Sequence, residues 1–295
     1  MGGKQAAFVF LVLAAGNAAH ATDEPPLDMA PSSQWVVDYA DDSCALRRAF
    51  EAGEERATLE LRQFSPGDGF RVSVVSDTMA RTRSGLRVRF EPDEGWFEPV
   101  APLLLSYDSH DKRQGVLYSD TLRPNAGKGS NGYTPPLPAA ARDAREAAIT
   151  GLTLSGVFDR EVTLRTGRLA APMSAMRTCL DELLTHWGLD AEVQRTLSRG
   201  VKPIDQMAWA QRVQSGFPSE MLRRGLSGAV QIRLIVDAEG KPTSCQVQLE
   251  ISQPEFEEHA CRTTMRYARF EPALDANGNP VASYFTSAIV YQAFR

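Results

Sequence analysis

The stretch Gly228–Ile251, GAVQIRLIVDAEGKPTSCQVQLEI, reads as two β-strands joined by a tight turn. Apolar residues alternate with polar ones in both strands, which predicts a sheet with one buried and one hydrated face. The residues predicted to be buried are Val230, Ile232, Leu234, Val236, Cys245, Val247, Leu249 and Ile251. Those predicted to be hydrated are Gln231, Arg233, Asp237, Ser244, Gln246, Gln248 and Glu250. The turn, DAEGKP, supplies a glycine for a positive φ and a proline that closes the loop.

The segments on either side of this hairpin complete a small domain, predicted over residues 215–295. A short helix opens at Phe217-Pro218 and ends at Gly225. After the hairpin, residues 254–267 predict a helix with acidic residues in its first turn and arginines later, as the helix dipole favours. A third strand is predicted over residues 282–294. The expected order is helix, strand, strand, helix, strand.

The four cysteines, Cys44, Cys179, Cys245 and Cys261, are expected to form disulfides, although their number alone leaves three pairings open. Cys245 has the apolar phase of its strand, and Cys261 lies on the apolar stripe of the helix that covers it. We therefore expect these two cysteines to form a disulfide, which would stabilise the folded domain by ~3 kcal/mol. By elimination, Cys44 pairs with Cys179.

The N-terminal domain is predicted over residues 34–190 and is rich in β-structure. Short alternating runs separated by turn residues indicate mostly antiparallel strands between residues 35 and 122 and again at 148–155 and 161–166. Residues 123–141 are rich in Gly, Pro and Asn and predict a long loop. A helix at 171–189 closes this domain, and residues 191–214, which show no clear period, are interpreted as a connection. The fold class is therefore α+β.

The first 21 residues have the layout of a secretory signal peptide: Lys4, an apolar run over residues 6–15, and a small-x-small site at Ala19-His20-Ala21. We expect cleavage after Ala21, an extended lead-in over residues 22–33, and a periplasmic protein. The alternative is a retained leader that anchors the chain, and membrane contact is expected only in that case. The run is shorter than the ~20 residues that cross a bilayer.

Composition and motifs argue against several function classes. The net charge is −5, without a basic block, so nucleic acid is not an expected partner. His110, His186 and His259 lack the spacing of a metal site, and no cofactor is expected. No nucleophile motif is present, so the protein is interpreted as non-enzymatic, with an envelope hydrolase of unknown type kept as an alternative.

Two further features have a plain structural interpretation. The adjacent carboxylates Asp41-Asp42 diverge along a strand and are expected to be solvated surface. The larger aromatic side chains could line a ligand groove, but most are expected to be core. These are Trp35, Trp96, Phe97, Trp187 and Trp209.

Several features of residues 217–295, in this order, resemble the C-terminal domain of TonB-type energy transducers. They are the aromatic-Pro pair Phe217-Pro218, Gly225 and Gly228 before the first strand, the turn Val236-Asp237-Ala238-Glu239-Gly240-Lys241-Pro242, the segment Arg269-Phe270-Glu271-Pro272-Ala273, and Gly278 before the last strand. The resemblance covers about a quarter of the chain.

The resemblance implies a protein partner, an outer-membrane receptor, whose extended segment is bound by strand addition. It implies that the final strand lies at a sheet edge and forms the binding surface: Ser283, Tyr284, Phe285, Thr286, Ser287, Ala288, Ile289, Val290 and Tyr291. The edge could instead be blocked by the chain itself or by dimerisation. Because the leader looks cleavable and a folded domain replaces the family's spacer, we expect a binding protein in TonB-related transport. The alternative is an anchored energy transducer.

Overall fold

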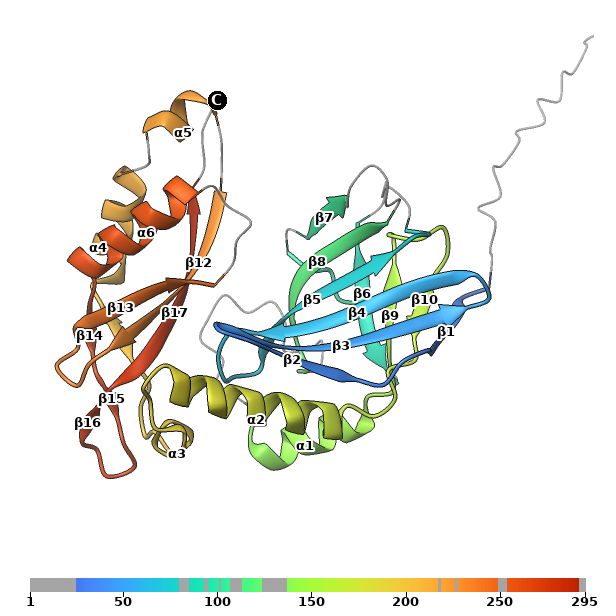
Figure 1. Ribbon diagram of the computed structural model, residues 1–295, viewed down its shortest axis with the longest axis horizontal. Helices are drawn as coiled ribbons and strands as arrows, with labels where there is room; N and C mark the ends of the chain where they lie inside the picture. Colours follow the sequence, from blue (N-terminus) through green and yellow to red (C-terminus); the bar gives the residue numbers. More distant parts are fainter. Residues whose placement is uncertain are drawn as a thin grey trace, which may run out of the picture.

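The computed structural model describes residues 25–79, 85–92, 95–100, 102–106, 113–123, 137–216, 219–225, 228–248 and 254–291. The predicted leader, the pair Phe217-Pro218, the end of the second hairpin strand and the last four residues lie outside these ranges. The described chain has two hydrophobic cores, one N-terminal and one C-terminal (Figure 1). Helices and strands occur in both parts, so the predicted α+β class is confirmed.

The N-terminal part is a curved sheet with strand order β6-β9-β10-β1-β3-β4-β5-β8-β7, and β2 pairs with β3 outside this path. The strands are β1 (Leu27–Pro31), β2 (Val36–Ala40), β3 (Ser43–Ala52), β4 (Glu55–Gln63), β5 (Gly69–Ser76), β6 (Arg87–Glu91), β7 (Leu103–Ser106), β8 (Gln114–Thr121), β9 (Gly151–Ser155) and β10 (Val162–Leu164). The sheet curls around one core, so that the Phe70 ring of β5 meets the Phe90 ring of β6 with centroids 6.4 Å apart.

Two helices lie along this sheet, α1 (Ala139–Ala148) and α2 (Ala170–His186). The apolar stripe of α2 packs against β3 (Figure 1). The Cys44–Cys179 disulfide joins the two elements, as the sequence predicts. This bond fixes the start of the N-terminal part to the helix that leads toward the C-terminal part.

The N-terminal part departs from the sequence interpretation in two places. Regular structure begins with β1, well before Gln34, because this short strand is held between β10 and β3. The sequence AAARDAREAA forms α1, although its first residues were predicted to belong to a loop and Ala148 to a strand. Alanine and arginine are strong helix formers, and the proline-rich residues before them conceal this local preference.

The C-terminal part has a three-stranded antiparallel sheet with the order β13-β12-β17. These strands are β12 (Gly228–Val236), β13 (Pro242–Val247) and β17 (Ser283–Tyr291). Helix α6 (Pro254–Tyr267) covers one face, with Phe256 and Ala260 fully buried against the strands. Short helix α5 (Ser219–Arg223) precedes β12 and buries Met221 in the same core.

The hairpin turn is constrained by a single glycine. Gly240 has φ +80°, and a Cβ on it would lie 1.9 Å from the carbonyl oxygen of Phe270. Its own carbonyl accepts a hydrogen bond from the Phe270 amide at 3.0 Å. The Cys245–Cys261 disulfide then ties β13 to α6, which is the second pairing that the sequence predicts.

The segment 191–214 is more than a connection. It contains α3 (Ala191–Arg195), β11 (Lys202–Ile204) and most of α4 (Gln206–Ser215). Trp209 and Val213, four residues apart, place α4 in the C-terminal core. Strand β11 pairs with β14 (Arg269–Glu271), and β15 (Ala273–Leu274) pairs with β16 (Pro280–Val281). Short elements of this kind carry too few residues for a period to be recognised.

Candidate functional site

Strand β17 lies at an edge of the C-terminal sheet, and its backbone direction follows from the register. The Gln248 amide donates to the Gln231 carbonyl, so the backbone groups of Gln231 point toward β13. Neighbouring residues in a strand point to opposite sides, so Val230 and Ile232 point toward β17 and bond there to Ile289 and Ser287.

The alternate residues of β17 therefore present their backbone groups outward. Within the described ranges, no hydrogen bond joins another segment to the outward groups of Tyr284, Thr286 and Ala288. We call this row of three residues the β17 edge. Unpaired N–H and C=O groups in a row are a template for a further strand. This is the edge position that the resemblance implies for residues 283–291.

The start of the edge is closed by the chain itself. The side-chain amide of Gln194 in α3 donates to the Ala282 carbonyl at 2.9 Å, and its oxygen accepts from the Ser283 hydroxyl at 2.6 Å. An incoming strand can therefore extend along β17 only from Tyr284 onward.

The inward side chains of β17 pack into the C-terminal core and fix the strand in place. Tyr291 is fully buried and stacks on Phe256 of α6, with ring centroids 4.8 Å apart. Phe285 contacts Phe270 at 5.0 Å, and Ile289 lies in the same core. One face of β17 packs on α6, and one of its edges pairs with β12. A partner strand could therefore pair with the other edge without any change in the conformation of β17.

The opposite face of this sheet, which the sequence predicts to be hydrated, is partly covered by the N-terminal part. Arg233 is buried and its Nη1 forms an ion pair with Asp42 at 2.8 Å. Its guanidinium carbon lies 3.8 Å from the centre of the Trp187 ring, at the end of α2. The prediction that Arg233 is hydrated and Asp42 simply solvated is wrong, because a second core-bearing unit packs on this face.

Two further hydrogen bonds cross the same contact. The Gln248 side chain, also buried rather than hydrated, donates to the Phe64 carbonyl at 2.7 Å. The Tyr284 hydroxyl donates to the Pro66 carbonyl at 3.1 Å. We call this contact, centred on the pair Asp42–Arg233, the junction. One of its side chains, that of Tyr284, belongs to the β17 edge itself.

Burial perturbs the ionisable groups at the junction. Desolvation lowers the pKa of Arg233, opposed by the attraction of Asp42, and the group stays cationic at neutral pH. Burial raises the pKa of the Tyr284 phenol to about 12, so its hydroxyl remains a donor to Pro66. Trp187 also belongs to the junction: its ring contacts Arg233 and Tyr284, and its buried indole Nε1 has no hydrogen-bond partner among the described residues.

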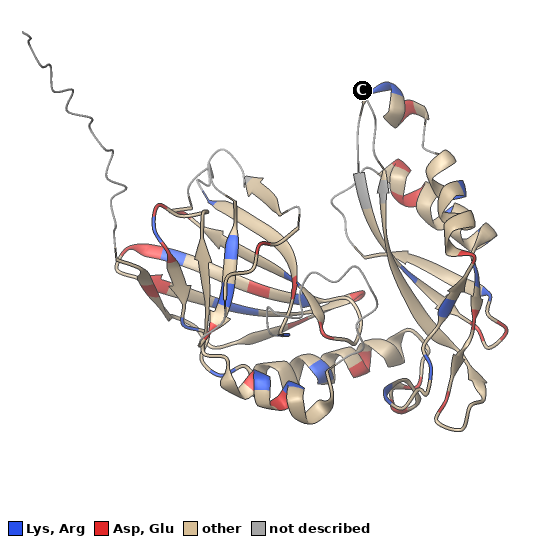
Figure 2. Ribbon diagram, turned by 180° about the vertical axis from the view of Figure 1, so that it is seen from behind, with Lys and Arg blue, Asp and Glu red and all other residues tan. Residues whose placement is uncertain are grey.

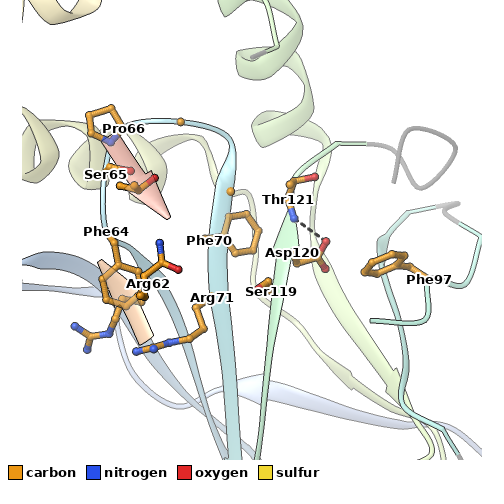
Figure 3. A pocket seen from close by; sticks show the side chains of 14 residues that line it. Arg62, Phe64, Ser65, Pro66, Phe70, Arg71, Phe97, Ser119, Asp120 and Thr121 are labelled. Atoms are coloured by element: carbon orange, nitrogen blue, oxygen red, sulfur yellow. Dashed lines mark hydrogen bonds between the residues drawn. The ribbon is translucent and has the colours of Figure 1, made fainter. Parts of the chain in front are cut away.

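A cavity of about 490 Å³ opens beside the junction (Figure 3). The β4–β5 turn, the start of β5 and the end of β8 line it together with Gln231 and Thr286 of the C-terminal sheet. Phe97 lies at this cavity, so one of the five aromatic residues considered for a groove is placed in one. The spacing of single residues in the sequence gives no indication of this cavity, because its walls come from both parts of the chain.

The other candidate residues are separate from these features. His259 contacts the Val213 carbonyl at 3.1 Å beside α4, and His186 ends α2. These histidines belong to no metal site: within the described ranges, no group of His, Cys, Asp or Glu side chains is arranged to hold a metal ion.

The surface charges and the helices of the chain bear on nucleic-acid and membrane binding. Basic and acidic residues interleave along the strands and α1 (Figure 2). Among the described residues, no helix combines the length and apolar character needed to span a membrane.

Comparison with known families identifies the C-terminal part. Residues 213–293 match the model of the family described as Gram-negative bacterial TonB protein C-terminal. The match confirms the resemblance seen in the sequence and includes α5, the three-stranded sheet and α6. A search of curated proteins found no match to this chain. The family match indicates a TonB-related role in the periplasm, and the domain it describes is a non-enzymatic energy-transducer domain.

Proposed function

We propose that this protein is an exported, non-enzymatic binding protein of the cell envelope that captures an extended segment of a partner protein at the β17 edge. The partner we propose is an outer-membrane receptor, and the process is TonB-related transmembrane transport. One observation carries the proposal: no hydrogen bond from another described segment reaches the outward backbone groups of Tyr284, Thr286 and Ala288, on a strand that pairs with β12 and packs into the C-terminal core.

The two edges of the sheet differ in what they offer a partner. Strand β17 pairs with β12 over nine residues and is continuous. Strand β13 has six residues, begins at Pro242, and is tied to α6 through Cys245. Proline removes a donor, and a short, irregular edge is a common way to prevent strand addition. The β17 edge is therefore the surface we assign to the partner.

The cysteines support export of the protein to the periplasm. The Cys44–Cys179 disulfide is buried in the N-terminal core and the Cys245–Cys261 disulfide is partly buried against the C-terminal core, and disulfides form and persist in oxidising compartments. Mass spectrometry of the protein recovered from cells decides the fate of the leader. We expect an N-terminus at Thr22. An intact Met1 on the recovered protein would instead favour the anchored energy transducer.

A photo-crosslinking amino acid placed at Ala288 tests the binding surface in living cells. Ala288 is exposed and its backbone groups point outward, so we expect a covalent adduct with an outer-membrane protein. The matched control is the same amino acid at Arg262, an exposed position of α6 on the opposite side of the sheet, where we expect no adduct. Equal adducts from both positions, or an adduct from Arg262 alone, would contradict the proposed surface.

A further inference from the structure

The cavity beside the junction is lined by a cation, Arg71, that forms no ion pair with any of the described residues. Arg71 lies in β5, with Arg62 of β4 and Ser119 of β8 as its neighbours across the strands. Its guanidinium lies over the Phe64 ring, 4.7 Å from the centroid. Figure 3 shows the Arg71 and Arg62 side chains reaching toward each other at one end of the cavity, while Asp120 and Phe97 lie at the other end.

The two arginines differ in how their charge is compensated. Arg62 donates to Glu60 at 2.9 Å through Nε and at 3.0 Å through Nη2, and its Nη1 donates to the Ser43 hydroxyl at 2.6 Å. Glu60 also binds Arg47, which pairs with Asp38. These four residues carry two positive and two negative charges. Arg71 is therefore the surplus cation of the group.

Among the described residues, none forms a hydrogen bond with the side-chain nitrogens of Arg71. Nε and Nη1 are buried and unpaired, which leaves Nη2 as the nitrogen open to the cavity. Burial, together with the nearby charge of Arg62, lowers the pKa of Arg71 to about 10, and the attraction of Glu60 opposes this shift only in part. A largely buried cation without a partner costs free energy, and an anionic ligand that supplies the missing acceptor would offset this cost.

The other residues that line the cavity indicate the chemical class of the ligand. Phe64, Phe70 and Phe97 supply aromatic surface, and the volume of about 490 Å³ lies in the range of small-molecule sites. Gln231 and Thr286 add polar groups from the C-terminal sheet. A single surplus charge matches a monoanion better than a phosphate, which carries about two charges at neutral pH. The planar fork of arginine fits a carboxylate.

We propose that the junction cavity binds a small monocarboxylate with an apolar body, and that Arg71 is the residue that recognises its carboxylate. The carboxylate approaches Nη2, and rotation of the guanidinium on the Phe64 ring brings a second nitrogen to it. The apolar body lies along the phenylalanine side chains. Because Gln231 and Thr286 belong to the C-terminal sheet, the bound ligand contacts both parts of the chain.

Calorimetric titration of the mature protein with phenylacetate and its neutral analogue phenylacetamide tests this site. We expect the acid to bind roughly 10- to 100-fold more tightly than the amide, the difference expected of hydrogen bonds between charged groups. A tripeptide ending in phenylalanine, with a free or an amidated C-terminus, shows whether the carboxylate can also be a chain end. The free peptide competes with phenylacetate if it can.

The variant Arg71→Met is expected to lose the preference for the acid while melting at a temperature no lower than the wild type, because an unpaired buried cation has been removed. Arg87→Met is the matched control. It removes a strand arginine that also stacks on an aromatic ring, that of Trp96, away from the cavity, and it should keep the preference.

Three results would overturn the proposal: no carboxylate binding at millimolar concentration, equal binding of acid and amide, or an unchanged preference in Arg71→Met. These measurements test Arg71 and the cavity, which shares only Thr286 with the β17 edge, and not the outward backbone groups of that edge, so failure here leaves the proposed partner surface untouched.

Discussion

Ala288→Pro abolishes partner capture while leaving the fold intact. The N–H of Ala288 points away from β12, so proline at this position removes no hydrogen bond of the existing sheet. Proline is tolerated at such outward positions of edge strands, but its ring blocks an incoming strand and a donor is lost. We expect binding of a receptor-derived peptide to weaken at least about tenfold, as measured by fluorescence anisotropy.

Two further variants, one at the same position and one at the preceding residue, serve as controls for this experiment. Ala288→Thr keeps the backbone donor and favours extended structure, so it should bind as the wild type does. Ser287→Pro removes a donor that points toward β12 and should destabilise the sheet itself. Tight peptide binding by a folded Ala288→Pro variant would show that the partner does not add to β17.

Asp42→Ala destabilises the junction by about 3 kcal/mol, because removing one partner of a buried pair leaves the other charge uncompensated. The side chain of Arg233 is 8% exposed and that of Asp42 27%, so the cation cannot turn to solvent without opening the contact. Urea unfolding followed by tryptophan fluorescence measures this effect, since Trp187 lies directly against Arg233.

The control for this substitution is the adjacent residue. Asp41 is exposed, and Asp41→Ala should change the free energy of unfolding by no more than about 0.5 kcal/mol. Arg233→Met removes the cation itself and fills part of the same space, so it should cost clearly less than Asp42→Ala. Equal effects of Asp41→Ala and Asp42→Ala would mean that the junction contributes little to stability.

The C-terminal sheet could be predicted because its information is local. The alternation of Val230, Ile232 and Leu234 sets the buried face, and Gly240 marks the turn. The phase of Cys245 against Cys261 identifies a disulfide, and both pairings are present in the structure. Each of these features depends on residues close together in the chain or on one element covering the next.

The junction and its cavity could not be predicted for the opposite reason. Arg233 and Gln248 have the pattern of hydrated residues, and only the packing of a part of the chain 191 residues away from Arg233 buries the arginine. Arg71 likewise follows the normal alternation of an exposed strand position. Alternation shows which face a side chain occupies, but it does not show whether another unit covers that face.

The N-terminal part gains a role from this arrangement. It holds the C-terminal sheet through Arg233, Gln248 and Tyr284, while α3 closes the first position of the edge through Gln194. The edge that we assign to the partner is thus defined by both parts of the chain. A ligand in the cavity would contact the same face of β12 and β17, through Gln231 and Thr286.

Amide hydrogen exchange, followed residue by residue in the mature protein with and without a receptor-derived peptide, tests the strand-addition account most directly. The amides of Phe285 and Ser287 point toward β12 and should exchange slowly in both states, which provides an internal standard. The account predicts that the peptide slows exchange at Tyr284, Thr286 and Ala288. A bound peptide that leaves these three amides exchanging as fast as in the free protein would contradict it.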